Sequence, residues 1–171
     1  WEGGQRLPFV VRWSGQIPAG TVSGELTTSM DVLPTLAAIA GTAAPTDRII
    51  DGQDVRSMWL QPESTKSPHE AFFYYLLDEL QAVRSGEWKL HTLSGDLYNL
   101  AADIGETANV AADNPEVIAR LEALAQACRE DIGDTATDTP GANRRPIGTV
   151  EDPKKLTEYD PTHPYMVAMY D

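Results

Sequence analysis

The chain of 171 residues is short of cysteine, because Cys128 is the only one that it contains. A single cysteine permits no internal disulfide. Cys128 also falls on the apolar face of a predicted helix, which favours a buried, unreactive thiol over a nucleophile. No apolar run reaches the roughly 20 residues that a transmembrane helix needs. The sequence therefore predicts neither a disulfide framework nor a membrane span.

Basic residues are also scarce, since 13 Lys and Arg stand against 26 Asp and Glu and leave a net charge of −13. Nucleic-acid binding requires a basic surface, so no nucleic-acid partner is predicted. The sequence has no G-x-S-x-G nucleophile elbow and no glycine loop of the phosphate-binding type. Its histidines, which are His69, His91 and His163, lack the spacing of zinc ligands. We therefore expect no catalytic residue and no metal ligand within this chain.

The first stretch of the chain is a polar loop that contains Gly3 and Gly4 and carries an acid and a base, Glu2 and Arg6. Adjacent glycines permit backbone angles and close approaches that a Cβ forbids. The loop runs into a short apolar stretch, which predicts a buried strand over residues 9–13. A loop at a strand end is a common place for a binding site, and a plain surface turn is the alternative.

A helix is predicted to follow between Thr28 and Gly41, since Thr28-Ser29 offers an N-cap and Gly41 is a good residue to end a helix. Apolar residues at helical spacing predict a stripe that packs on a sheet. They are Leu33, Leu36, Ala37 and Ala40. Asp31 in the first turn would complement the helix dipole, which we favour over a role as a metal ligand. For the acidic stretch 47–54 we likewise favour a hydrogen-bonded turn over a calcium loop.

Residues 61–70 are rich in Pro, Ser and Thr and form the best candidate linker. After them, alternating runs are separated by turns that contain Gly86 and Gly95, which indicates hairpins and about four antiparallel strands. Asn114 and the proline after it then predict the start of a long helix. Its apolar face needs a partner, and the preceding sheet is the obvious one.

A tail over residues 135–171 lacks clear periodicity but keeps apolar and aromatic anchors. They include Leu156, Tyr159, Tyr165, Met166, Val167, Met169 and Tyr170. Pure disorder rarely keeps so many anchors, so we predict an irregular tail that docks on the body of the protein.

A series of sequence blocks runs from residue 1 to about residue 134. The blocks are Glu2-Gly3-Gly4-x-Arg6-x-Pro8-Phe9-x-Val11-Arg12-Trp13-x-Gly15-x-Ile17-Pro18-Ala19-Gly20, Ser29-Met30-Asp31-Val32-Leu33-Pro34-Thr35-Leu36, Asp51-Gly52-x-Asp54, Ala82-Val83-Arg84-x-Gly86-x-Trp88-Lys89-Leu90 and Leu97-Tyr98-Asn99-Leu100-x-x-Asp103-x-Gly105-Glu106-x-x-Asn109. In order and gaps these blocks resemble the late segment of the sulfatase family, which belongs to the alkaline-phosphatase-like superfamily.

The resemblance implies an α/β (α+β) fold. Residues 1–60 would be the last strand and helix of a large catalytic α/β domain, and residues 61–70 a linker. Residues 71–134 would be a small C-terminal subdomain, an antiparallel sheet packed on one long helix, and residues 135–171 the docked tail. The chain is therefore interpreted as part of a longer enzyme.

The activity implied by the resemblance is hydrolysis of aryl or carbohydrate sulfate esters. The formylglycine nucleophile and the calcium ligands of such enzymes lie in segments that would precede Trp1, so the chain alone is expected to be inactive. Its partners would be a sulfated small molecule or glycan and the upstream catalytic domain. Family habit suggests a periplasmic or secreted location.

Four residues are candidates for substrate binding, and they are Trp1, Gly3, Arg6 and His91. The first three would lie in a loop near the sulfate pocket. For Arg6 we favour a structural role, through its forked guanidinium, over attraction of an anion. Alternation places His91 with Lys89 on one strand face; we favour a solvated face, and the polar wall of a substrate cleft is the alternative.

Two other functions remain open at this point. One is a phosphonate or phosphate monoester hydrolase of the same superfamily, since the discriminating residues would lie upstream. The other is a non-catalytic glycan-binding module. Its aromatic surface would comprise Tyr74, Tyr75, Trp88 and His91.

Overall fold

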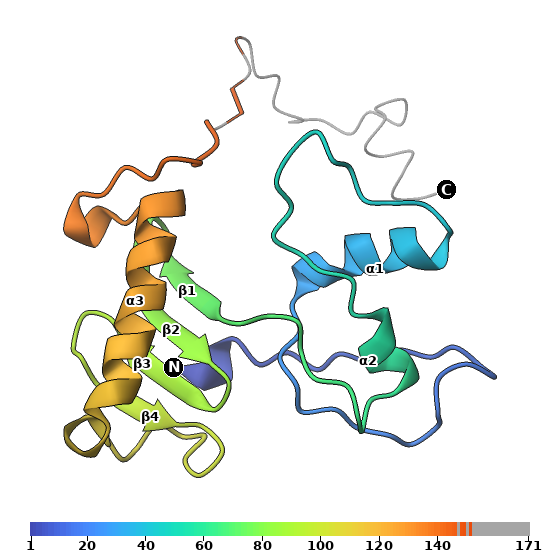
Figure 1. Ribbon diagram of the computed structural model, residues 1–171, viewed down its shortest axis with the longest axis horizontal. Helices are drawn as coiled ribbons and strands as arrows, with labels where there is room; N and C mark the ends of the chain where they lie inside the picture. The colour runs from blue at the N-terminus through green and yellow to red at the C-terminus, as the bar shows by residue number, and fades with distance from the viewer. Residues whose placement is uncertain (147, 150, 152–171) are drawn as a thin grey trace, which may run out of the picture.

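The structure is a computed structural model that describes residues 1–146, 148, 149 and 151. Its best-packed part is an antiparallel sheet in the order β1-β2-β3-β4 together with one long helix. The strands are β1 (Phe72–Leu76), β2 (Glu79–Ser85), β3 (Trp88–His91) and β4 (Leu97–Asn99), and the helix is α3 (Pro115–Ile132). Figure 1 shows α3 lying along this sheet. The predicted sheet of about four strands packed on one long helix is confirmed.

The turn between β2 and β3 follows from its sequence. Gly86 has a φ of 59°, a backbone angle that a residue with a Cβ rarely adopts. It lets Ser85 pair with Trp88 directly across the hairpin. The helix also begins and ends as predicted, with Pro115 at its first turn and Gly133 (φ 91°) after its last. Asn114 precedes the helix, but its amide donates to the Val110 carbonyl instead of capping the helix.

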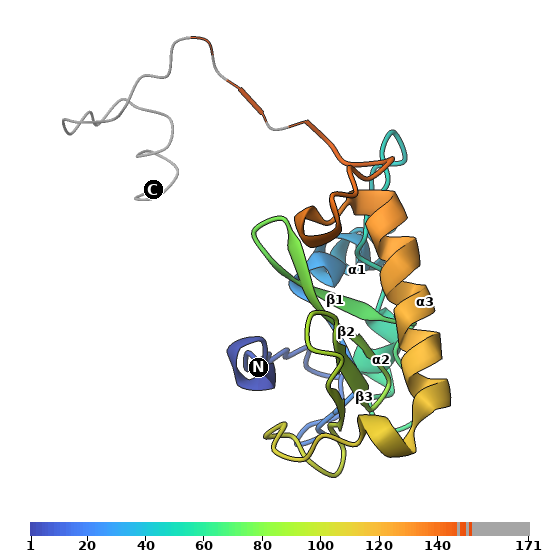
Figure 2. The ribbon, with the colours of Figure 1, turned by 90° about the vertical axis from the view of Figure 1, so that its left-hand side faces the viewer.

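The two faces of the sheet differ because side chains alternate along each strand. One row across the sheet, Val83, Leu90 and Leu97, is apolar and buried. It packs with Leu121 and Ala125 of α3 in the hydrophobic core. Figure 2 shows α3 on this side of the sheet and the N-terminal turn η1 (Glu2–Gly4) on the other. The second face is therefore covered by the start of the chain.

Cys128 belongs to the helix side of this core. Its thiol is buried, as predicted. Burial raises the pKa of the thiol, although a contact with the Tyr75 hydroxyl works in the opposite direction. A buried thiol with a raised pKa is unreactive, which agrees with the interpretation from the sequence.

Residues before the sheet form short helices and long loops. The helices are α1 (Val32–Ile39), preceded by the turn η2 (Ser29–Asp31), and α2 (Arg56–Leu60). The helix predicted between Thr28 and Gly41 is present, but Leu33 and Leu36 of its stripe are exposed. The expectation that this stripe packs on the sheet is wrong for the described residues, because α1 packs mainly against η2 and α2.

The strand predicted over residues 9–13 is also wrong, because this segment is irregular. Phe9 and Val10 are 56% and 90% exposed. A strand needs a neighbour to pair its backbone groups, and the described residues place none beside this segment. One apolar side chain of this segment does have a partner, since the Phe9 ring contacts the Trp59 ring.

The loops around α1 are held by a buried carboxylate. Asp31 accepts hydrogen bonds from the Thr28 and Gln53 backbone N–H groups, and its Oδ1 lies 2.8 Å from His69 Nε2. Gly52 allows this arrangement, since a Cβ there would lie 2.0 Å from the Met30 carbonyl oxygen. Asp31 thus ties together three segments of the chain.

The proposed domain boundaries, with residues 61–70 as a linker, stay predictions. Residues 61–70 contain neither helix nor strand. The tail was predicted to dock through anchors from Leu156 to Tyr170, and these lie outside the described residues. Within the described part, residues 135–137 form a short turn, η4 (Thr135–Thr137), beside a bridge between Asp134 and Thr139.

Candidate functional site

The candidate site lies on the sheet face opposite α3, where the loop that begins at Trp1 rests on the strands (Figure 2). Charged side chains from distant parts of the sequence meet there. We call this set the ionic cluster, and its members are Glu2, Arg6, Tyr74, Arg84, Lys89, His91 and Glu106.

Glu2 is the buried acid that the loop brings to the cluster. Its Oε2 accepts from the Tyr74 hydroxyl at 2.8 Å and from Lys89 Nζ at 3.3 Å. Its Oε1 accepts from an Arg84 guanidinium nitrogen at 2.8 Å and from Arg6 Nε at 3.2 Å. Both carboxylate oxygens are therefore satisfied by cations or hydroxyls, as a buried charge requires.

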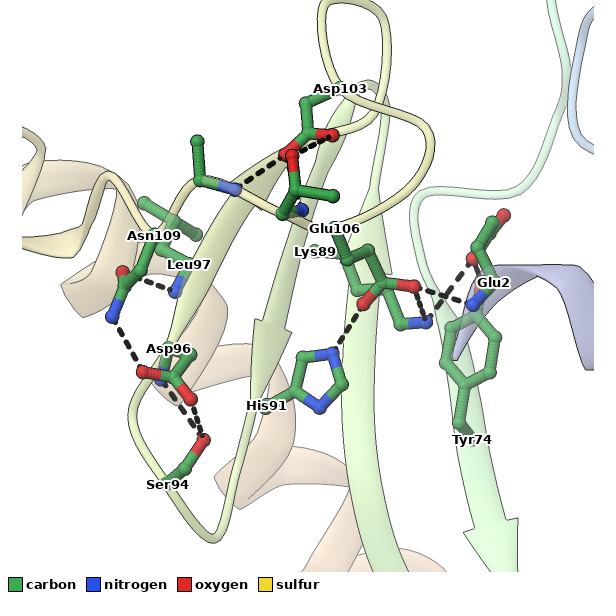
Figure 3. Close-up of polar contacts among 12 residues, drawn as sticks. Glu2, Tyr74, Lys89, His91, Ser94, Asp96, Leu97, Asp103, Glu106 and Asn109 are labelled. Atoms are coloured by element: carbon green, nitrogen blue, oxygen red, sulfur yellow. Dashed lines mark hydrogen bonds and ion pairs between the residues drawn. The ribbon is translucent and has the colours of Figure 1, made fainter.

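Glu106 supplies the second buried carboxylate (Figure 3). Its Oε1 accepts from Lys89 Nζ at 2.9 Å and from the Glu2 backbone N–H. Its Oε2 bonds to His91 Nε2. Glu106 therefore contacts both the N-terminal loop and the strand β3.

Lys89 lies between the two carboxylates. It is 1% exposed, and its ammonium also sits 4.4 Å from the centre of the Tyr74 ring. The favoured prediction of a solvated face for His91 and Lys89 is therefore wrong. Alternation correctly put both on the face opposite Leu90, but the loop of Glu2 and the loop of Glu106 cover that face and exclude water from Lys89.

Both carboxylates stay charged at neutral pH. Burial alone would raise the pKa of Glu2, but the Tyr74 hydroxyl, Lys89 and Arg84 outweigh it and hold the pKa below 4.5, the ordinary value. Burial likewise acts to raise the pKa of Glu106, but hydrogen bonds from His91, Lys89 and the Glu2 backbone outweigh it. The cluster is thus a set of charged groups that stabilise one another.

A tight loop presents Glu106 to the cluster. Asp103 accepts from the Thr107 and Ala108 backbone N–H groups at 2.7 and 2.8 Å. Glu106 has a φ of 54°, a left-handed angle that is uncommon for a residue with a side chain. The hydrogen bonds of Asp103 hold the loop in this shape, so the strained backbone of Glu106 persists only with their support.

Asn109 fixes the same loop to the sheet. Its Oδ1 accepts from the Leu97 backbone N–H at 3.2 Å, and its amide donates to Asp96 (Figure 3). The Asp103, Glu106 and Asn109 side chains therefore act together, two to shape the loop and one to reach Lys89.

Aromatic rings border the cluster. The Trp1 ring lies 5.3 Å from His91 and 6.5 Å from Tyr98, measured between ring centres. His91 and Tyr98 meet edge to face at 5.5 Å. Trp1 is 76% exposed, so one surface of this aromatic group faces outward.

The structure places all four candidate substrate-binding residues on this face, and three of them make contacts there. Trp1 and His91 are in contact, and Arg6 bonds to Glu2 within the ionic cluster. Gly3 lies in the same turn and is exposed; a Cβ there would meet no described atom within 4 Å. The close approach suggested for the glycine pair is therefore not made within the described residues. That these residues bind substrate stays a prediction.

The main residues that the sequence did not assign to a site are Lys89 and Glu106. Two signals pointed toward them. Alternation placed Lys89 beside His91, and Glu106 sits in one of the family-like blocks. Neither signal shows that these side chains meet Glu2, which precedes them by 87 and 104 residues.

The aromatic surface proposed for a glycan-binding module is not formed. Tyr74 and His91 lie on the face of the ionic cluster. Tyr75 and Trp88 instead pack against the core that faces α3. The four residues were grouped because all have aromatic rings, but side chains alternate along a strand, so the two pairs lie on opposite faces of the sheet.

The described residues include no group of three or more His, Cys, Asp or Glu side chains arranged to hold a metal ion. The expectation that the calcium ligands lie in preceding segments stays a prediction. In the same part of the chain, we find no helix with both the length and the apolar character needed to cross a membrane.

Comparison with known proteins identifies the family. A family model described as "N-sulphoglucosamine sulphohydrolase, C-terminal" matches residues 1–131. The chain belongs to this sulfatase family. The matched range contains the whole ionic cluster, from Glu2 to Glu106.

Curated sulfatases share about half of the chain. An arylsulfatase from Hemicentrotus pulcherrimus is 50% identical over 91 residues, which are 53% of this chain and 16% of that protein. Human steryl-sulfatase is 46% identical over 49% of the chain and 14% of its own length, and dog N-acetylgalactosamine-6-sulfatase is 44% identical over 53% and 17%. The matched stretch is therefore about one sixth of each relative.

Solved structures share the fold. One, a protein in complex with its substrate D-glucosamine-2-N,6-O-disulfate, has a TM-score of 0.59 and 22% identity, and the match covers 82% of this chain and 31% of that one. Ps i-CgsB in complex with k-i-k-neocarrahexaose has a TM-score of 0.56 and 22% identity, over 68% and 27%. At this identity they support the fold alone.

Proposed function

We propose that the protein containing this chain is a sulfuric ester hydrolase that acts on aryl or carbohydrate sulfates. The chain belongs to a sulfatase family, and its curated relatives bear sulfatase names. The match spans about one sixth of those relatives. The activity of the whole protein is therefore proposed from the similarity to sulfatases.

The family match carries the proposed activity, and the part that this chain plays in it is argued from the way the sheet holds the loop that begins at Trp1. Glu2 in this loop is anchored through its side chain by Lys89 and through its backbone N–H by Glu106. Buried, mutually paired charges fix geometry closely, since each alternative position leaves a charge unpaired. The role proposed for this chain is thus to hold one wall of a substrate pocket, with Trp1, Gly3, Arg6 and His91 near the substrate.

Formylglycine and calcium would come from segments that precede Trp1. When bound, calcium would supply stabilisation of charge on the sulfate oxygens. The residues described here would supply neither the nucleophile nor the metal ligands, so the chain alone is proposed to be inactive. The further partners would be a sulfated small molecule or glycan and the upstream domain, and the location periplasmic or secreted.

The proposal is tested with the protein expressed together with its preceding segments. We expect it to release sulfate from 4-nitrophenyl sulfate or from sulfated monosaccharides, and we expect mass spectrometry to find the formylglycine aldehyde in the preceding segments. The 171-residue chain alone is the control and should release none. Release of phosphate from phosphate or phosphonate esters, with no turnover of any sulfate, would replace this proposal with the phosphohydrolase alternative.

A further inference from the structure

The tip of the β1–β2 hairpin carries an apolar side chain that the described residues leave uncovered. Leu76 pairs with Glu79, so Leu77 and Asp78 form a two-residue turn. Leu77 is 92% exposed and has a φ of 54°, an angle that glycine normally supplies in such turns. An exposed leucine on a strained backbone is unfavourable on both counts, and strain of this kind points to a functional contact.

Leu77 borders an open cavity of about 200 Å³ at the end of α3. The other residues that line it are Tyr75, Asp78, Ile132, Gly133 and Arg144. Its apolar wall includes Leu77 and Ile132, both exposed, and an ion pair between Asp78 and Arg144 lies beside this wall. A cavity of about 150 Å³ already takes a benzene-sized ring, so this one can take one bulky apolar or aromatic side chain.

The start of the tail is fixed beside this cavity, as Figure 2 shows at the end of α3. The Thr135 backbone N–H donates to the Asp78 carbonyl at 2.9 Å. The backbone N–H groups of Ala142 and Asn143 donate to carbonyls in the last turn of α3, each at 2.8 Å. The next residue, Arg144, lines the cavity itself, so the rest of the tail begins at the edge of the cavity.

The tail also contains side chains that suit the cavity. They include Leu156, Tyr159 and Tyr165, which lie outside the described residues. A chain spans at most about 3.3–3.6 Å per residue, so the stretch from Arg144 to Leu156 can reach about 40 Å, ample for a return to the cavity. A tethered segment also has an effective concentration in the millimolar range, which favours it over a second copy of the chain.

We propose that the tail docks on the hairpin tip, with an apolar or aromatic side chain from residues 156–170 in the cavity against Leu77 and Ile132. The family model matches the chain only to residue 131, so the proposed occupant lies outside the matched range. The inference is independent of the sulfatase function and gives the exposed hairpin tip a partner within the same chain.

Photo-crosslinking identifies the occupant directly. In the protein with its preceding segments, Leu77 is replaced by a photoreactive diazirine amino acid of similar size, and mass spectrometry maps the crosslinked peptides. We expect links to residues 156–170 of the same chain. The matched control carries the probe at Ile104, an exposed residue that follows β4 at the opposite end of the sheet, and it should link to none of these residues.

Leu77→Gly tests the same contact without a probe. Glycine adopts the strained angle freely, so this variant should fold. Trypsin cleavage after Lys155, directly before Leu156, should become about 5-fold to 10-fold faster, because loss of a buried leucine contact raises the population of undocked tail. Ile104→Ala, which also removes an exposed apolar side chain, should leave this rate unchanged.

The outcomes separate the tail from the other possible occupants. Links from position 77 to a second copy or to the preceding segments overturn the inference, and so does the absence of any link to residues 156–170. An unchanged rate of cleavage after Lys155 in Leu77→Gly overturns it as well. Neither measurement depends on turnover of a sulfate ester, so the sulfatase function is tested separately.

Discussion

The two faces of the same sheet are held by different forces. One face buries Val83, Leu90 and Leu97 against α3, and the other buries Lys89 between the carboxylates of Glu2 and Glu106. Apolar contacts tolerate small shifts, whereas a buried ion pair loses its stability unless every charge keeps its partner. The apolar face therefore supplies stability, and the ionic face defines where the loop of Trp1 lies.

The largest effect is expected from Lys89→Met, which keeps the length of the side chain and removes its charge. Two buried carboxylates would lose their common partner, and breaking a buried pair costs about 3–5 kcal/mol. Urea unfolding of the 171-residue chain at pH 7 measures the loss. Adding Glu106→Gln should restore part of it, since one unpaired charge is then removed. A loss below that of Arg6→Gln would show that the ionic face is not buried in solution.

On the apolar face, Leu90→Ala is the matched change, because Leu90 follows Lys89 in β3 and points the other way. Its truncation leaves a cavity in the core that contains Leu121 and should cost about 2–5 kcal/mol. The same urea titration at pH 5 and pH 7 should give equal losses. A loss that depends on pH would mean that the two faces are coupled.

Acid should affect only the ionic face. The pKa values of Glu2 and Glu106 are lowered on folding, so their contribution is fully present above the unfolded value of 4.5 and is lost as pH falls through the lower folded values. We expect the free energy of unfolding to decrease below about pH 4.5, by less than the loss in Lys89→Met. Glu106→Gln should flatten this decrease and Leu90→Ala should not. An unchanged slope in Glu106→Gln would contradict the assignment.

The smallest effect is expected at the rim of the cluster. The Arg6 side chain is 43% exposed, and ion pairs at such positions contribute at most about 1 kcal/mol. Arg6→Gln should therefore shift the urea midpoint only slightly. A loss as large as that of Lys89→Met would place Arg6 among the buried partners of Glu2.

Much of the sheet and helix could be predicted from local sequence. Alternation and the turn at Gly86 gave the hairpin, and Pro115 and Gly133 gave the bounds of α3, because these features depend on residues close in the chain. The strand over residues 9–13 was wrong for the complementary reason. A strand is stable only when a neighbouring strand pairs with it. The described strands all belong to the sheet β1-β2-β3-β4, and the local sequence of residues 9–13 does not reveal whether a partner strand is present.

The candidate site was predicted less well. Trp1, Arg6 and His91 were chosen from motif and pattern, but a solvated face was favoured for the strand face that His91 shares with Lys89, and Lys89 is buried. Its burial depends on partners 87 positions before it and 17 after it in the sequence.

By itself, the sequence determined which stretches form the hairpins and the long helix, and which side chains of β3 share a face. Those outcomes depend on backbone periods of two and 3.6 residues, which any window of the chain contains. Only the tertiary structure decided what covers the second face. A charge is stable in the interior when opposite charges and hydrogen-bond donors surround it, and the folded chain brought Glu2 and Glu106 to Lys89 from opposite sides.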